Sequence, residues 1–244
     1  MKYAFIADIH ANLAALDAVL AKIDTLGCDK ILCLGDVVGY NASPAECIER
    51  LIARKIFTLS GNHDRYAATG EVDDVRPESL VVIDWTREHL TPEQLKWLSK
   101  LPDQHTLDGN YLLVHGSPLD RDEYLLKPPQ WQSSLKAMRT TFFGLDLCFF
   151  GHTHYPMVIA KGMEETDIKV DRTIALKRGN PTLINPGAVG QPRDGCPKAS
   201  FCVHDSSAYN VTYYRVDYDI ADTQRRLAEA KLPKRHGDRL ALGK

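Results

Sequence analysis

The chain has 244 residues, of which 44% are hydrophobic and 25% charged, and its formal net charge is -2. This length fits one large domain or two small ones and allows a core that needs no disulfides. The slightly acidic balance lacks the basic excess of a protein that binds duplex nucleic acid. Six cysteines without a CxxC pair predict reduced, mostly buried thiols rather than a zinc ribbon or a disulfide framework.

The sequence shows no sign of a membrane anchor or an export signal. No run of residues is long and apolar enough to span a bilayer. The short apolar run after Lys2 is interrupted by Asp8 and His10, and no cleavage site follows a true hydrophobic region. We therefore expect a cytoplasmic protein.

The first sixty residues alternate between the patterns of strands and helices. The strand-like runs are continuous and apolar, as expected for strands buried on both faces, and they cover residues 3–7, 31–34 and 56–59. Asn12 is a good cap for a helix that ends at Gly27, and Ser43 is the expected cap of a second helix over 44–53. This order predicts parallel strands with right-handed crossovers.

The rest of the chain moves from helices to strands. Helices are predicted at 77–90, 92–101, 131–143 and 220–230, with Thr91 capping the second. Strands are predicted at 105–107, 111–115, 147–150, 157–160, 173–177, 182–184, 199–204 and 210–216, the first two joined by the hairpin turn Asp108-Gly109-Asn110. Residues 1–232 are predicted to form one domain, and the basic segment 233–244 is predicted to be a mobile tail.

Five polar segments follow predicted strands directly and hold most of the side chains suited to metal binding. They are Asp8-Ile9-His10, Gly35-Asp36, Gly61-Asn62-His63-Asp64, His115-Gly116 and Gly151-His152-Thr153-His154. In an open α/β sheet, residues just past the carboxyl ends of the strands meet in one crevice. Five of the nine histidines lie in these segments, which core packing does not explain.

The residue types in these segments indicate two transition-metal ions. Seven candidate ligands, more than one tetrahedral ion needs, are Asp8, His10, Asp36, Asn62, His115, His152 and His154. Nitrogen and oxygen donors without a thiolate favour Mn²⁺, Fe, Zn²⁺ or Ni²⁺ over Ca²⁺ or Mg²⁺, and a carboxylate such as Asp36 can bridge two ions. Two ions ~3.5–4 Å apart would clamp an in-line displacement by a bridging hydroxide. His63 is not needed as a ligand, so it is the candidate general acid for the leaving group.

These segments resemble the calcineurin-like metallophosphoesterases, whose pattern is D-x-H, G-D, G-N-H-[DE], a lone H, and G-H-x-H. All five blocks occur here in order between Asp8 and His154. The resemblance implies a four-layer α/β/β/α sandwich of two mixed sheets flanked by helices. It also implies one ion on Asp8, His10 and His154, the other on Asn62, His115 and His152, with Asp36 bridging and His63 as proton donor. The implied activity is hydrolysis of a small phosphate monoester or diester, or of a nucleotide, with Mn²⁺ as the favoured ion.

Within this family, the segment from Asn185 to Gly195 resembles YfcE-like and diadenosine-tetraphosphatase-like bacterial phosphoesterases. The protein phosphatases and symmetrical diadenosine tetraphosphatases carry G-D-x-x-D/A-R-G, where this chain has Tyr40 in place of the phosphate-binding arginine. Gly39 stands where the protein phosphatases have the aspartate that orients the catalytic histidine. The substrate therefore does not follow from these motifs.

Several residues allow two interpretations. Asn12 is equally consistent with a helix cap and with a phosphate contact, and Arg193 either contacts a substrate phosphate or pairs with Asp194. The remaining histidines, His89, His105, His204 and His236, are expected to be structural or exposed. Two alternatives to a small-molecule phosphoesterase are a non-catalytic scaffold, which the presence of His63 disfavours, and a nuclease, which the acidic net charge disfavours.

Overall fold

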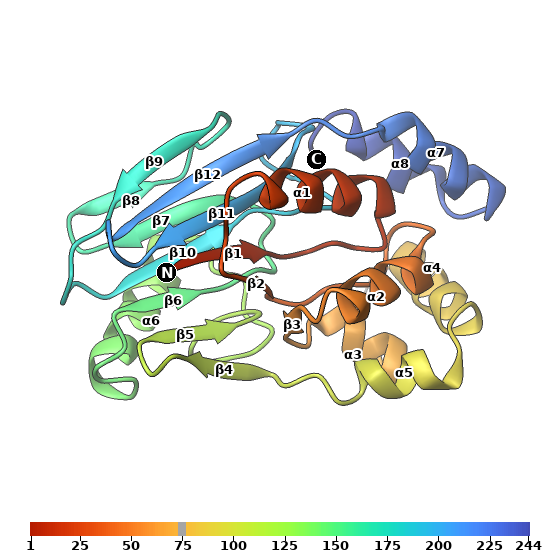
Figure 1. Ribbon diagram of the computed structural model, residues 1–244. Helices are drawn as coiled ribbons and strands as arrows, with labels where there is room; N and C mark the ends of the chain where they lie inside the picture. The colour runs from red at the N-terminus through yellow and green to blue at the C-terminus, as the bar shows by residue number, and fades with distance from the viewer. Residues whose placement is uncertain (73–76) are drawn as a thin grey trace.

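In the computed structural model, which describes residues 1–72 and 77–244, two six-stranded sheets lie face to face between helices (Figure 1). The first sheet has the strand order β3 (Phe57–Thr58), β2 (Lys30–Cys33), β1 (Lys2–Ile6), β11 (Ala199–Asp205), β12 (Asn210–Val216) and β9 (Arg172–Ala175). The second has the order β4 (Gln104–Leu107), β5 (Tyr111–Val114), β6 (Leu147–Phe149), β10 (Thr182–Pro186), β7 (Pro156–Ala160) and β8 (Met163–Glu165).

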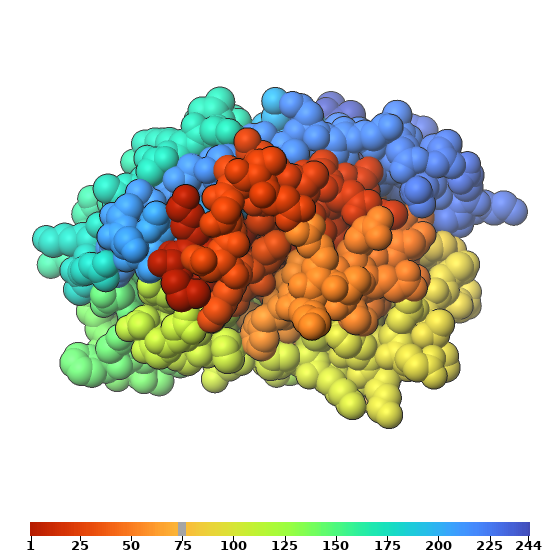
Figure 2. Space-filling model, viewed as in Figure 1, coloured from red at the N-terminus to blue at the C-terminus, as the bar shows by residue number. Residues whose placement is uncertain are grey.

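Helices cover the outer faces of both sheets and one end of the molecule. They are α1 (Leu13–Asp24), α2 (Pro44–Ala53), α3 (Asn62–Thr69), α4 (Pro77–Glu88), α5 (Pro92–Leu98), α6 (Pro128–Thr140), α7 (Ile220–Glu229) and α8 (Lys234–Leu240). In Figure 2 the N-terminal part of the chain, in red and orange, lies between the blue C-terminal segment above and the yellow segment below. Among the helices of the described ranges, none is long and apolar enough to cross a membrane.

The alternation of side chains along β1 shows how the layers form. Ala4 and Ile6 point outward into a cluster built with α1 and α2, whereas Tyr3 and Phe5 point inward into a cluster shared by both sheets. The Phe5 ring stacks on the ring of Phe149 from the second sheet, with centroids 3.7 Å apart. A third cluster joins the other face of the second sheet to α6. The predicted four-layer α/β/β/α architecture is confirmed.

The topology brings the carboxyl ends of six strands to one edge. Strands β1, β2 and β3 pair in parallel in the first sheet, and β5, β6 and β10 do so in the second. The parallel order predicted for the first sixty residues and the hairpin over Asp108-Gly109-Asn110 are confirmed. Asn12 and Thr91 cap α1 and α5 as predicted, and the cysteines are free and mostly buried.

Four features differ from the sequence-based expectations. Helix α3 and strand β8 were not predicted, because the glycine-led turn before α3 and the short, polar β8 carry little apolar periodicity. Ser43 stands at the start of α2, but its side chain makes no capping bond. The segment predicted as a mobile tail contains α8, whose His236 and Leu240 are buried. One buried leucine and one buried histidine in a basic sequence are too weak a pattern to predict a helix.

A buried ion pair secures the loop that follows β10. Arg215 on β12 pairs with Asp194, and the two side chains are 2% and 6% exposed. The Arg215 Nε also donates to the Ile168 carbonyl at 2.9 Å. The pair therefore ties the loop that carries Arg193 to the first sheet.

Removing the Asp194 carboxylate leaves the Arg215 charge buried without its partner. We expect Asp194→Ala to lower the free energy of unfolding by about 3–5 kcal/mol, measured by urea denaturation. The control is Asp217→Ala, since Asp217 pairs with Lys198 at the surface and its side chain is 81% exposed. That change should cost less than about 1 kcal/mol. Equal losses for the two variants would contradict the structural role of the buried pair.

Candidate metal centre

Each predicted ligand lies just beyond the carboxyl end of a strand at the shared edge. Asp8 and His10 follow β1, Asp36 follows β2, and Asn62 opens α3 just after β3. From the second sheet, His115 follows β5, and His152 and His154 follow β6. All seven side chains are buried. The two sheets thus contribute ligands to one crevice, as expected for the carboxyl edge of an α/β sheet.

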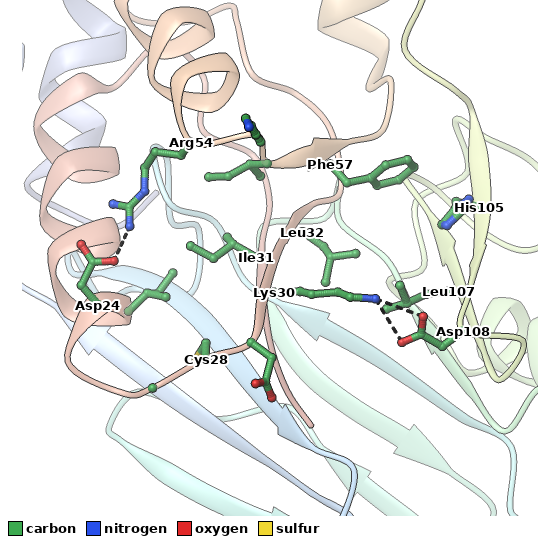
Figure 3. A pocket seen from close by; sticks show the side chains of 15 residues that line it. Asp24, Cys28, Lys30, Ile31, Leu32, Arg54, Phe57, His105, Leu107 and Asp108 are labelled. Atoms are coloured by element: carbon green, nitrogen blue, oxygen red, sulfur yellow. Dashed lines mark hydrogen bonds and ion pairs between the residues drawn. The ribbon is translucent and has the colours of Figure 1, made fainter.

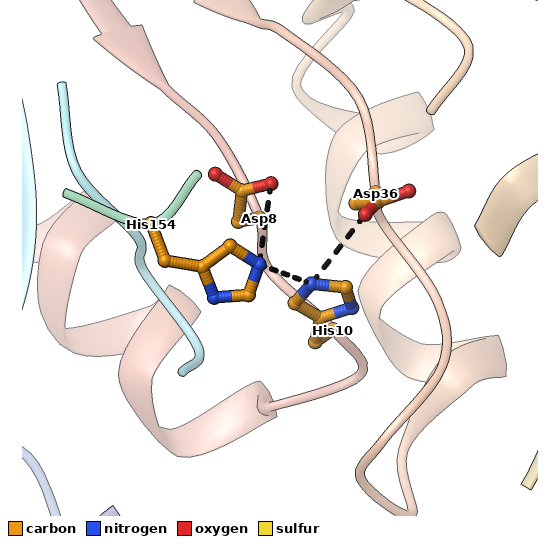
Figure 4. A group of neighbouring side chains, drawn as sticks. All are labelled: Asp8, His10, Asp36 and His154. Atoms are coloured by element: carbon orange, nitrogen blue, oxygen red, sulfur yellow. Dashed lines mark hydrogen bonds and ion pairs between the residues drawn. The ribbon is translucent and has the colours of Figure 1, made fainter. Parts of the chain in front are cut away.

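Four of these side chains form a first group that could hold a metal ion, namely Asp8, His10, Asp36 and His154 (Figure 4). The Nε2 atoms of His10 and His154 lie 3.1 Å apart. His10 Nε2 lies 3.5 Å from Asp36 Oδ2, and His154 Nε2 lies 3.7 Å from Asp8 Oδ1. Two imidazoles and two carboxylates therefore face a common centre.

A second group of Asp36, His115 and His152 lies beside the first. The Nε2 atom of His115 is 3.4 Å from Asp36 Oδ2 and 3.3 Å from the side-chain oxygen of Asn62. Asp36 Oδ2 is thus almost equally far from His10 and His115, one from each group. Its other oxygen, Oδ1, accepts the backbone N–H of His63 at 2.9 Å. This geometry suits a carboxylate shared by two ions.

Hydrogen bonds from the protein backbone orient the histidine rings. The Nδ1 atoms of His10, His115 and His154 each face a backbone carbonyl, at 3.1, 2.8 and 2.6 Å. This arrangement places the proton on Nδ1 and leaves Nε2 as the ligand atom. His152 is reversed, since its Nε2 faces the Asp122 carbonyl at 3.0 Å and its Nδ1 is left to bind.

The backbone at these ligands is strained. Five of the seven, Asp8, His10, Asp36, His152 and His154, have φ values between 47° and 66°, in the left-handed region that non-glycine residues rarely occupy. Such a conformation costs roughly 1–3 kcal/mol per residue and persists only where the surroundings impose it. Its concentration at ligand positions marks the crevice as a functional site.

The electrostatics of the crevice fit bound cations. Asp8 is fully buried, and its Oδ2 atom meets no hydrogen-bond donor among the described residues. Burial raises the pKa of Asp8 to about 7. Burial would also raise the pKa of Asp36, but the neighbouring His115 and His63 hold it well below its usual range. A cation would relieve the cost of the buried Asp8 carboxylate, so the residues present fit a divalent metal centre.

Asp64, the last residue of the third polar segment, has a structural role that the sequence reasoning did not assign. Its carboxylate accepts the backbone N–H groups of Val37 and Val38, at 2.9 and 3.2 Å, and of Gly61 at 3.0 Å. Asp64 thereby joins the loop carrying Asp36 to the start of α3. The sequence did hold a sign of this role, because Asp64 occupies the acidic fourth position of the G-N-H-[DE] block.

His63 lies beside the ligands without joining either metal group. Its ring centroid is 4.9 Å from that of His10 and 4.5 Å from that of Tyr40. Burial lowers the pKa of His63 to about 4, so the free ring is neutral at pH 7. Its Nδ1 atom meets no hydrogen-bond partner in the described part of the chain, and a Cβ at Gly39 would lie 2.4 Å from that atom. Glycine at position 39 therefore makes room for the catalytic candidate.

The two candidate substrate contacts differ in their surroundings. Asn12 is fully buried; its amide nitrogen donates to the Gly190 carbonyl at 2.9 Å, and its oxygen accepts from Ala15 and Thr223. Both polar ends are used within the protein, so we do not include Asn12 among the proposed phosphate contacts.

Arg193 does not make the salt bridge with Asp194 that the sequence allowed, because Asp194 pairs with Arg215. Instead, Arg193 donates to Gln191 Oε1 at 3.2 Å and to the Tyr40 hydroxyl at 3.4 Å. Its guanidinium borders a cavity that His63 and Asn62 also line. Tyr40 and Tyr124 line this cavity too.

Comparisons with known proteins agree with this geometry. Residues 1–208 match the model of the calcineurin-like phosphoesterase superfamily domain. An uncharacterized protein of Methanocaldococcus jannaschii is 36% identical over 99% of this chain and 98% of its own length. The crystal structure of a metallophosphoesterase from Sphaerobacter thermophilus has a TM-score of 0.85 and 37% identity, over 100% of this chain and 99% of that one.

The crystal structure of a hypothetical protein from Pyrococcus horikoshii OT3 shares the fold, with a TM-score of 0.79 at 23% identity over 100% and 98% of the two chains. The family match and the 37% identical metallophosphoesterase cover the strand-end residues described above. The chain belongs to the calcineurin-like phosphoesterase superfamily.

Proposed function

We propose that this protein is a dinuclear metal-dependent phosphohydrolase that cleaves small phosphate monoesters or diesters. The observation that carries the proposal is the pair of ligand groups sharing Asp36, with His63 directly beside them. A scaffold on the same fold would have no use for a buried histidine that binds neither ion. The proposal therefore places the chain among the catalytic members of its superfamily.

Asp8, His10 and His154 are the proposed ligands of one ion, and Asn62, His115 and His152 those of the other, with Asp36 between them. Mn²⁺ is the proposed native ion, although Fe, Zn²⁺ and Ni²⁺ suit the same donors. When bound, the two ions supply a water-derived nucleophile near neutral pH and neutralise charge on the phosphoryl oxygens. The protein's part is to hold the ester against this centre and to provide a proton.

His63 is the proposed proton donor to the leaving-group oxygen. Its backbone N–H is fixed on Asp36 at 2.9 Å, so the ring is held at a defined place beside the shared ligand. A phosphate ester bound nearby places negative charge next to the imidazole and favours its protonated form. The rings of Tyr40 and His10 pack against it and limit its rotation.

Arg193 is the proposed contact to a substrate phosphate. Its Nε atom is buried and has no hydrogen-bond partner among the described residues. A planar guanidinium recognises phosphate oxygens through two parallel N–H groups. The Arg193 guanidinium carbon lies 5.8 Å from the centre of the Tyr40 ring. Arg193 thus comes close to the position at which related enzymes carry an arginine in the G-D motif.

The proposal is tested by metal analysis and a simple activity assay. Protein purified without chelator should contain about two divalent ions per chain and should hydrolyse p-nitrophenyl phosphate or its bis ester, with Mn²⁺ added where needed. Dialysis against EDTA should abolish the activity, and Mn²⁺ should restore it. Protein that binds no divalent ion and cleaves neither ester after Mn²⁺ addition would show the proposal to be wrong.

The role of His63 predicts a split between catalysis and metal binding. His63→Ala should lower kcat for phenyl phosphate, whose basic phenolate leaving group needs a proton, by about 10²–10⁴-fold, while the metal content stays unchanged. His89→Ala is the control, since His89 is exposed and stacks on Trp85 away from the site. An unchanged kcat in the His63 variant would remove this residue from the acid role.

The role of Arg193 predicts an effect on substrate binding. Arg193→Ala should raise KM for p-nitrophenyl phosphate by about tenfold, as expected for the loss of one charge-assisted contact. Arg121→Ala is the control, because Arg121 is 53% exposed and pairs with Asp103 at the surface. If KM is the same in both variants and in the wild type, Arg193 does not contact the substrate.

A further inference from the structure

A cavity of about 240 Å³ opens next to the metal centre, on the side where His63 lies. His63 and Asn62 line it on the side of the centre, and helix α8 supplies Arg235, His236 and Arg239 to its wall. The helices α8 and α4 that border the cavity lie at the same end of the molecule (Figure 1). A segment with the composition of a surface tail thus forms part of the site.

Several buried side-chain atoms around this cavity lack a hydrogen-bond partner of ordinary geometry within residues 1–72 and 77–244. His236 is only 3% exposed, and neither ring nitrogen has a hydrogen-bond partner of ordinary geometry, although the Glu78 backbone approaches the ring. The same holds for Nδ1 of His63 and Nε of Arg193. Leaving buried polar atoms unsatisfied is costly, so their accumulation around one cavity indicates a polar ligand, and Arg193 Nε requires an acceptor oxygen on it.

The charge of the cavity indicates that this ligand is an anion. Arg193 has no carboxylate partner within ion-pair distance in residues 1–72 and 77–244, and Arg235 makes a single long contact of 3.4 Å to Glu78. Glu78 is the one acidic residue among those described around the cavity. Arginine forks and imidazole N–H groups are the groups that proteins use to hold phosphate.

A second hollow on the surface differs from this cavity in how its charged side chains are paired. A larger hollow of about 600 Å³ lies at the opposite, amino end of β2 (Figure 3). Four of its charged side chains form two ion pairs, Arg54 with Asp24 and Lys30 with Asp108. The small cavity at the metal centre differs because its buried polar groups lack partners.

We propose that the cavity between His63 and helix α8 binds a second phosphate, carried by the leaving group of the substrate, with His236 and Arg235 as the residues that select for it. This inference rests on the proposed function, in which His63 donates its proton to the leaving group. A leaving group that meets His63 extends into the space which His63 lines, and that space ends at α8. The preferred substrates are then bisphosphates, such as a nucleoside phosphorylated at both the 3′ and the 5′ position.

The test compares substrates with and without the second phosphate. For the Mn²⁺-loaded enzyme, kcat/KM for adenosine 3′,5′-bisphosphate should exceed that for adenosine 3′-monophosphate and 5′-monophosphate by about tenfold or more, mainly through KM. His236→Ala and Arg235→Ala should each bring this ratio toward one. Arg235 is 56% exposed, so its variant is expected to fold even if the loss of the buried His236 disturbs α8.

Lys234→Ala is the matched control, because Lys234 lies on the same helix, is 86% exposed and pairs with Asp238. It should keep both the ratio and the rate on p-nitrophenyl phosphate. A wild-type ratio near one, with p-nitrophenyl phosphate still cleaved, would overturn the second-phosphate site and leave the proposed function standing. A high ratio that survives in both the Arg235 and His236 variants would place the site elsewhere. No cleavage of any ester would overturn both proposals.

Discussion

The site depends on the left-handed backbone of the residues that end the central strands. An extended chain leaving a sheet edge carries its side chains away from the neighbouring strands, so ligands from separate strands meet only if the backbone turns sharply. Asp8, Asp36 and His152 make this turn with positive φ, as His10 and His154 do. Each such residue costs roughly 1–3 kcal/mol, and five together approach the net stability of a domain.

Hydrogen bonds between the strand-end loops offset this strain. The backbone N–H of Asp8 donates to the backbone carbonyl of Gly35 at 3.0 Å, and that of His10 donates to the backbone carbonyl of Asp36 at 2.9 Å. The backbone N–H of His152 donates to the Asp8 carboxylate at 3.0 Å, which joins the two sheets at the ligands themselves. Asp64 adds the link between the Asp36 loop and α3. Each strand-end loop therefore holds its neighbours in place, and the ligands reach their positions only when the loops of both sheets have come together.

The dependence of the ligand positions on contacts between loops explains how much of the site could be predicted from the sequence. Continuous apolar runs such as 3–7 and 31–34 identify buried strands, and parallel order follows from the intervening helices, so the convergence of strand-end ligands was predictable. The distances among Asp36, His10 and His115 were not, because they result from contacts between separate strand-end loops, Asp36 with His10 and Asp36 with His115. Local pattern carries no information about such contacts.

The C-terminal helix α8 is a second feature that the sequence pattern could not predict. Its sequence is basic and nearly free of apolar residues, so periodicity gives no sign that His236 is buried beside Tyr40, with ring centroids 5.2 Å apart. The family model ends at residue 208, so all seven candidate ligands and His63 lie within the matched region, whereas α8 lies beyond it. Because α8 lies outside the metal-binding core, substitutions in it can alter the charge and shape of the cavity without disturbing the strained strand ends. The strand-end residues would then determine the reaction chemistry, and α8 would determine the choice of substrate.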